Sequence, residues 1–246
     1  MDAKEVGPPR VTDISKSPDR IAGMFDAIAG RYDVLNHVLS AGIDRRWRRR
    51  AIASLDLSGT ERVLDLCTGT ADLAIAALRA RPPAARVVGV DFAGGMLQIG
   101  RRKVAREGLN GRIALVRGDA TRIPLADASV DAVTIAFGIR NVDRIAVAGA
   151  EMCRVLKPGG RLAILEFAVP TTPGLRLLYL WYLNRVLPLI GRVVSRHNEA
   201  YGYLPASIGA FTSPADFVKI LQQAGFRDIA PVRLTFGSVI LYTARR

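Results

Sequence analysis

The stretch that most constrains the fold runs from Val63 to Asp72, where a short apolar strand leads into a turn and then into a helix. The turn, from Cys67 to Ala71, contains only small residues, so a ligand can lie directly against its backbone. The N–H groups at the start of the following helix point toward the same place. This pattern predicts a strand, a cofactor-binding loop and a helix at the centre of an α/β domain.

The alternation of strand and helix continues after this stretch. Short apolar runs predict strands at 62–66, 86–91, 113–118, 130–137 and 161–167. Helical patterns lie between them at 72–81, 95–107 and 143–156. A last helix after Ser213 and two strands, 229–234 and 239–243, predict a closing antiparallel hairpin. This order is typical of a mostly parallel, doubly wound sheet with right-handed crossovers, so the predicted fold is α/β and Rossmann-like.

Further segments flank and interrupt this alternation. Residues 1–16 lack periodicity and predict a flexible tail, and residues 17–246 predict a single domain. Within 17–58 we expect a cap of N-terminal helices: one opened by Ser17 and Pro18, a second piece over 31–40, and a third from Asp44. Residues 168–212 predict an insertion before the last helix, amphipathic over 175–194.

Composition narrows the class of partner. The chain has 35 Lys and Arg against 22 Asp and Glu, a net charge of +13, which favours an anionic partner such as nucleic acid or an acidic lipid surface. Only two cysteines and no charged-then-apolar leader predict a reducing, cytoplasmic location without disulfides. No stretch reaches the ~18 apolar residues of a membrane span, so we expect a soluble or peripheral protein.

Chemistry-bearing side chains follow successive strands at the edge where doubly wound sheets bind ligands. Asp65 ends the first strand, and Asp91 ends the second, where a carboxylate can accept both ribose hydroxyls. After the third strand, Asp119 and the N–H of Ala120 suit an adenine edge. Each acid alone could simply cap a helix, as we expect of Asp72. Because the glycine patterns of dinucleotide and phosphate loops are absent, the set favours S-adenosylmethionine, a nucleoside cofactor without phosphates.

More specific motifs make the sequence resemble one family. They are Tyr32-Asp33 with Asn36, Ser40 and Trp47, then Phe137-Gly138-Ile139-Arg140-Asn141-Val142, Lys157-Pro158-Gly159-Gly160 with Glu166, and Tyr203-Leu204-Pro205. Together they resemble the menaquinone/ubiquinone biosynthesis C-methyltransferases over almost the whole chain after the tail. The resemblance implies a class I S-adenosylmethionine-dependent methyltransferase with a seven-stranded sheet. It also implies methylation of a polyprenyl quinol ring carbon, from demethylmenaquinol to menaquinol or on 2-methoxy-6-polyprenyl-1,4-benzoquinol.

The resemblance also implies roles for particular residues. Thr70, Asp91, Asp119 and Ala120 are expected to contact the cofactor, with Asp65 reaching its methionine amino group. From their place at the end of the fourth strand, beside the expected methyl group, Arg140 and Asn141 are expected to orient and polarise the quinol oxygen, the alternative being a structural turn. Tyr32 is expected to close over the cofactor as a lid, the alternative being a core residue. His197 is a weak candidate base, and no metal is expected.

Some positions depart from the family pattern, and some interpretations stay open. Ala71 replaces a usual glycine, and Ala136 stands where many relatives have a cofactor-contacting serine. The amphipathic insertion predicts a mouth for the prenyl tail, a contact with the inner face of the membrane, or a helix that covers the sheet. The arginines around Trp47 favour anionic headgroups or a solvated helix face. Alternatives for the whole chain are an RNA or other small-molecule methyltransferase and a non-enzymatic scaffold of a quinone-biosynthesis complex. We expect no nucleic-acid partner; an oligomer is open.

Overall fold

The computed structural model describes residues 17–186 and 198–246. The predicted tail over 1–16 and the candidate base His197 lie outside the described residues. None of the helices in the described ranges is long and apolar enough to cross a membrane.

The centre of the protein is a seven-stranded sheet in the order β3-β2-β1-β4-β5-β7-β6. Its strands are β1 (Arg62–Leu66), β2 (Arg86–Asp91), β3 (Ile113–Arg117), β4 (Val130–Ala136), β5 (Leu156–Phe167), β6 (Arg227–Leu234) and β7 (Val239–Arg245). The first five run parallel, and β7 pairs antiparallel with both β5 and β6. The predicted mostly parallel sheet with an antiparallel hairpin is therefore confirmed.

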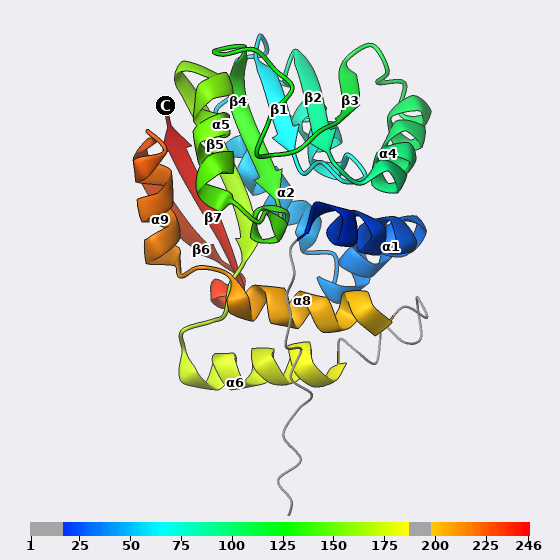
Figure 1. The fold of residues 1–246 in the computed structure, drawn as a ribbon, viewed down its shortest axis with the longest axis vertical. Coiled ribbons are helices and arrows are strands. Elements are labelled where there is room, and N and C mark those ends of the chain that lie inside the picture. Colours follow the sequence, from blue (N-terminus) through cyan, green and yellow to red (C-terminus); the bar gives the residue numbers. More distant parts are fainter. Residues whose placement is uncertain (1–16, 187–197) are drawn as a thin grey trace, which may run out of the picture.

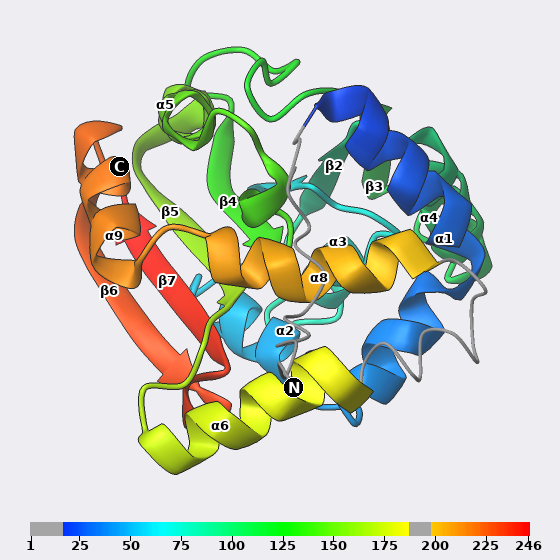
Figure 2. The same ribbon diagram turned by 60° about the horizontal axis from the view of Figure 1, so that its bottom comes forward.

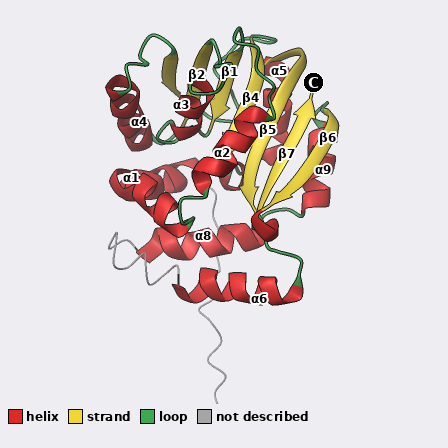
Figure 3. Cartoon of the chain, turned by 180° about the vertical axis from the view of Figure 1, so that it is seen from behind, coloured by secondary structure: helices red, strands yellow, loops and turns green. Residues whose placement is uncertain are grey.

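Helices cover both faces of this sheet (Figures 1 and 3). On one face pack α5 (Ile145–Val155) and α9 (Pro214–Gln223), whose Met152 and Phe217 are wholly buried. On the other face pack α2 (Asp44–Ala53) and α3 (Asp72–Leu78), with α4 (Gly94–Arg106) beside β3. The central strands are near-continuous apolar runs because both of their faces are covered.

A second group of helices crosses the edge where the parallel strands end (Figures 1 and 2). It consists of α1 (Pro18–Leu39), α6 (Pro173–Trp181) with the π-helical turn η2 (Tyr182–Val186), and α8 (Asn198–Ala210). The order of strands reverses between β1 and β4, which is where an open α/β sheet forms its ligand crevice. These helices therefore roof the predicted ligand-binding edge.

Several predicted boundaries are wrong. The two helical pieces expected before residue 40 form the single helix α1, because Ala29 and Tyr32 pack against Met96 and keep the chain helical through Gly30. Strand β5 begins at Leu156 and not at residue 161, since Leu156 pairs with Val130 of β4. The helix predicted over 72–81 ends at Leu78.

Candidate functional site

The turn between β1 and α3 has an unusual backbone. Cys67, Gly69 and Ala71 all adopt positive φ angles of 54°, 55° and 68°. The N–H of Gly69 donates to Asp91 Oδ2 at 2.8 Å, which ties the turn to the end of β2. Ala71 is thus a wholly buried alanine in a left-handed conformation that favours glycine, the residue expected there in the family pattern.

Asp91 lies beside this turn with its carboxylate buried. Its second oxygen, Oδ1, accepts from the N–H of Ala93 at 2.9 Å. Burial raises the pKa of Asp91 even though these N–H groups stabilise the ionised form. The N–H of Gly118 donates to the Asp91 carbonyl at 2.9 Å, which brings Asp119 to the neighbouring strand end. Asp119 is exposed and accepts from the N–H of Thr121 at 2.8 Å. Ala120 is buried, 6% exposed, with its side chain in the core.

Asp65 lies under the turn, almost wholly buried. Its carboxylate accepts hydrogen bonds from Thr68 Oγ1 at 2.5 Å and from Thr134 Oγ1 at 2.8 Å. Burial raises the pKa of Asp65 to about 6, although both hydroxyls stabilise the ionised form. In these contacts the carboxylate holds the turn to β4.

Thr70 connects the turn to two helices. Its hydroxyl donates to Asp33 Oδ1 of α1 at 2.5 Å, and Lys103 Nζ of α4 lies 2.8 Å from Asp33 Oδ2. Lys103 also binds Asp72. Asp72 begins α3, so its carboxylate lies in the first turn at the positive end of the helix, as predicted. It makes no capping hydrogen bond, and the N-cap residue is Ala71.

The turn after β4 holds the predicted catalytic pair. Arg140 and Asn141 lie in the short 3-10 helix η1 (Ile139–Asn141), and both are buried. Arg140 Nη1 lies 2.9 Å from Glu166 Oε1, and Arg140 Nε donates to Ser207 Oγ at 3.2 Å. Asn141 Oδ1 accepts from the hydroxyl of Tyr203 at 3.0 Å.

Arg140, Tyr32 and Tyr203 line one small cavity of about 50 Å³ between α1, α8 and the strand ends. Burial raises the pKa values of both tyrosines, so their hydroxyls stay protonated at neutral pH. The structure thus brings Tyr32 and Arg140 to one cavity, with Asn141 connected to it through Tyr203.

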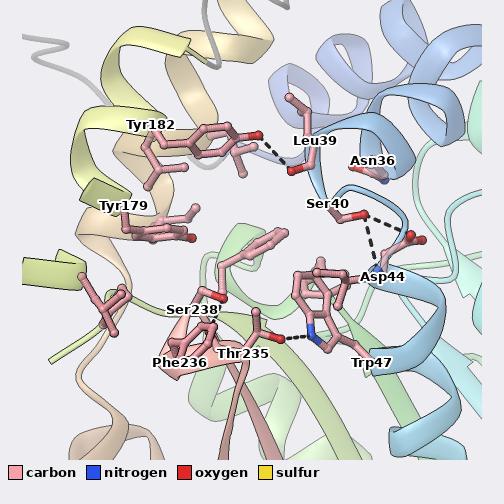
Figure 4. Close-up of a pocket in the computed structure, with 18 of the residues that line it drawn as sticks. Asn36, Leu39, Ser40, Asp44, Trp47, Tyr179, Tyr182, Thr235, Phe236 and Ser238 are labelled. Atoms are coloured by element: carbon pink, nitrogen blue, oxygen red, sulfur yellow. Dashed lines mark hydrogen bonds between the residues drawn. The ribbon is translucent and has the colours of Figure 1, made fainter. Parts of the chain in front are cut away.

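A larger cavity has a volume of about 460 Å³ (Figure 4). It adjoins the small one, because the two share Phe137, Phe167, Asn36, Leu39 and Leu204. Aromatic and aliphatic side chains of α6 and η2 form one wall, and the polar groups of α1 and α2 form the opposite wall. The 3-10 turn η3 (Thr235–Gly237) lies between them, where Trp47 Nε1 donates to Thr235 Oγ1 at 2.8 Å.

The sequence reasoning missed several of these residues. Glu166 and Asp33 belong to motifs that the sequence shows but to which no role is assigned, and the sequence does not point to Ser207 or Lys103. For Glu166 a signal exists: a lone acid within an apolar strand must be buried beside a donor. Lys103 and Asp33 carry no such signal, because helix surfaces are commonly charged.

Comparisons with known proteins agree with this geometry. Residues 13–246 match the model of the ubiE/COQ5 methyltransferase family. The ubiquinone/menaquinone biosynthesis C-methyltransferase UbiE of Geobacter sulfurreducens is 46% identical, covering 95% of this chain and 91% of the relative. A demethylmenaquinone methyltransferase of Bacteroides fragilis is 42% identical, and the match covers 94% of each chain. Another, of Thermus thermophilus, is 46% identical, and the match covers 91% of this chain and 100% of the relative.

Solved structures share the fold. A SAM-dependent methyltransferase from Aquifex aeolicus has a TM-score of 0.58 at 20% identity, covering 80% of this chain and 88% of that one. Phosphoethanolamine N-methyltransferase 2 of Haemonchus contortus, solved with S-adenosyl-L-methionine, has a TM-score of 0.56 at 20% identity. The match covers 77% of this chain and 39% of that one. The fold is thus that of the class I methyltransferases. The extent of the sequence matches shows that the chain belongs to the ubiE/COQ5 methyltransferase family.

Proposed function

We propose that this protein transfers a methyl group from S-adenosylmethionine to a ring carbon of a polyprenyl quinol. The observation that carries the proposal is the junction of two cavities: a small one lined by Arg140 and Tyr32, and a large apolar one that continues from it. A polar reacting end beside a long apolar space suits an aromatic ring that bears a prenyl tail.

The residues at the strand ends fit S-adenosylmethionine. The turn from Cys67 to Ala71 presents backbone and small side chains, and the buried Asp91 carboxylate lies next to it. Asp91 would hold the ribose hydroxyls, Asp119 and Ala120 the adenine, and Thr70 and Asp65 the methionine end. When bound, this cofactor supplies an electrophilic methyl group on sulfur.

The protein's own part of the reaction is to activate and orient the ring. The permanently charged Arg140 favours the ionised quinol oxygen, whose electron pair makes the neighbouring ring carbon nucleophilic. Glu166 fixes the guanidinium, so its orientation requires no rearrangement during the reaction. Asn141 and Tyr203 complete the polar side of the ring, and Tyr32 on α1 closes the site as a lid.

We propose demethylmenaquinol as the substrate, with 2-methoxy-6-polyprenyl-1,4-benzoquinol as the second candidate. Relatives at 46% identity are named for both ubiquinone and menaquinone biosynthesis, which keeps the benzoquinol in view. The large cavity would take the first prenyl units, since it is lined by side chains such as Leu175, Leu178 and Leu183.

We also propose a peripheral contact with an anionic membrane surface. Leu178, Trp181 and Phe236 line the large cavity and are also exposed to solvent, and Leu177 beside them is 71% exposed. Exposed apolar side chains at a cavity mouth suit entry of a lipid substrate from a bilayer. The net charge of +13 adds attraction to acidic headgroups.

The proposed activity is tested by incubating the purified protein with radiolabelled S-adenosylmethionine, in separate reactions with reduced demethylmenaquinone, the reduced benzoquinone, and RNA. We expect label in the naphthoquinol, and none with the control variant Asp91→Ala, which removes the carboxylate assigned to the ribose. Label in RNA but in neither lipid would contradict the proposal. Quinol binding without any transfer would favour the scaffold alternative instead.

A further inference from the structure

Arg48 on α2 is a buried cation with an incomplete set of partners. Its residue is only 9% exposed, and it lines the large apolar cavity. Its nearest carboxylate oxygens are Asp44 Oδ2, 3.6 Å from Nε, and Asp72 Oδ2, 4.0 Å from Nη2. Among the described residues no acceptor lies within hydrogen-bond distance of Nε.

The two acids beside Arg48 are engaged elsewhere. Asp44 Oδ1 accepts from Ser40 Oγ at 3.1 Å and lies 3.2 Å from His37 Nδ1 (Figure 4 shows the serine contact). Asp72 binds Lys103. A buried guanidinium without a close acceptor costs free energy. Nε itself has almost no accessible surface, so a ligand in the cavity would meet the terminal nitrogens, of which Nη2 lies 4.0 Å from Asp72 Oδ2.

The position of Arg48 relative to Arg140 indicates which ligand atom it would meet. Phe137 and Phe167 stack with their ring centroids 4.3 Å apart, and both rings line the two adjoining cavities. The Arg48 guanidinium carbon lies 5.7 Å from the centroid of Phe137, and that of Arg140 lies 5.4 Å from the centroid of Phe167. Each ring of this stacked pair therefore has one of the two cations near it, and the pair borders both cavities.

We propose that Arg48 binds the second ring oxygen of a 1,4-dioxygenated aromatic substrate, while Arg140 acts on the first. This proposal rests on the proposed function. A prenyl chain contains no hydrogen-bond acceptor, so in a prenylated naphthoquinol only the two ring oxygens can satisfy these arginines. Arg140 already forms an ion pair, with Nη1 2.9 Å from Glu166 Oε1, whereas the carboxylate oxygen closest to Arg48 is 3.6 Å from its Nε. Arg48 thereby distinguishes a quinol from a ring with one oxygen.

Binding can be measured without turnover, because the chain contains only two tryptophans, Trp47 and Trp181, and both line the large cavity. The substitution Trp181→Phe leaves Trp47, the neighbour of Arg48, as the single fluorescent reporter. In this background, quenching is titrated under anaerobic conditions with 2-geranyl-1,4-naphthoquinol and with two geranyl-1-naphthols, each lacking a different ring hydroxyl.

We expect Arg48→Met to weaken the quinol and one of the naphthols about tenfold, the loss typical of a charged hydrogen bond, and to leave the other naphthol within twofold. Arg48→Lys should restore part of the affinity, because the ammonium is still a donor. Arg46→Met, at an exposed position of the same helix, should bind all three ligands like the parent. Thermal unfolding of each variant establishes that it is folded.

The outcomes separate this proposal from the one beneath it. Equal weakening of all three ligands by Arg48→Met would overturn the assignment, since it would mean that Arg48 only shapes the cavity. Unchanged binding of all three would also overturn it and would indicate that solvent satisfies the guanidinium. If the parent chain binds none of the ligands, the quinol substrate itself is wrong and both proposals fail.

Discussion

Arg140 and Glu166 form an ion pair that is shielded from solvent, with side chains only 5% and 1% exposed and Nη1 2.9 Å from Oε1. The second carboxylate oxygen of Glu166 accepts from the backbone N–H of Arg140 at 3.2 Å. One acid on β5 therefore holds both the main chain and the side chain of the turn that follows β4. The turn proposed as the reacting end of the site is thus held in place by β5.

Replacing Arg140 by Ala should abolish methyl transfer and also destabilise the protein. Glu166 would remain buried without its partner, a change that typically costs about 3–5 kcal/mol of unfolding free energy in urea titrations. The double variant Arg140→Met with Glu166→Gln removes both charges and should recover most of this stability. Its transfer rate should stay reduced by about 10² or more, because the donor is still missing. A double variant that regains activity would contradict a chemical role for Arg140.

A second prediction concerns Gly138, which lies against Cys67 where the turns after β4 and β1 meet. A Cβ on Gly138 would overlap the Cβ of Cys67, so the backbones would have to separate. We expect Gly138→Ala to lower the unfolding free energy by about 3 kcal/mol.

The matched control is Cys67→Gly, which removes the clashing Cβ at a position whose φ of 54° suits glycine. Alone it should change stability by only about 1 kcal/mol, since relief of strain offsets the lost thiol packing. Combined with Gly138→Ala, it should restore most of the lost stability. If the double variant shows the sum of the two single effects, the close approach of these turns is not what limits residue 138.

The strand ends of this site could be predicted from sequence because buried parallel strands are continuous apolar runs, and the acids that close them are conspicuous. The pairing of Arg140 with Glu166 could not. It depends on the register of β4 against β5, which sets Ala136 opposite Leu165 and so brings the turn beside Glu166. Local patterns locate strands, but pairing between them follows from tertiary packing.

The buried cation Arg48 illustrates the same limit. It belongs to a run of arginines that could equally be a solvated helix face. The packing of α2 distinguishes Arg48 from the others, because it lies on the buried side of the helix with Trp47 and Ala51. The exposed arginines of the run are Arg45, Arg46, Arg49 and Arg50. Helix α1 runs through the point where the sequence predicts two pieces: Gly30 costs about 1 kcal/mol in a helix, and the contacts of its neighbours with Met96 offset this.

A third prediction follows from the pKa of Asp65, which burial raises from 3.8 to about 6. The folded protein binds this proton more tightly than the unfolded chain, so the contribution of Asp65 to stability falls as the pH rises between these values. The expected loss is about 3 kcal/mol, complete near pH 7. Asp65→Asn does not titrate, so wild-type stability minus that of the variant should fall by about 2.5 kcal/mol from pH 4 to 7, the rest of the loss lying below pH 4. The unfolding free energies of both proteins are measured by urea titration at each pH. If the two plots of free energy against pH run parallel, the prediction is contradicted.

The exposed apolar side chains of α6 give the last prediction. Leu177 is 71% exposed yet does not line the large cavity, so Leu177→Glu can test membrane contact without altering the site. We expect the wild type to sediment with vesicles containing acidic lipids, less strongly as salt rises, because the screening length shortens. The variant should lose at least about tenfold in binding, since inserting a leucine stabilises by ~1.5–3 kcal/mol and the new charge is repelled.

The control is Val147→Glu on α5, also exposed but away from α6, which should bind as the wild type does. Equal losses in both variants would mean that net charge alone governs binding, and α6 would then have no special part in it.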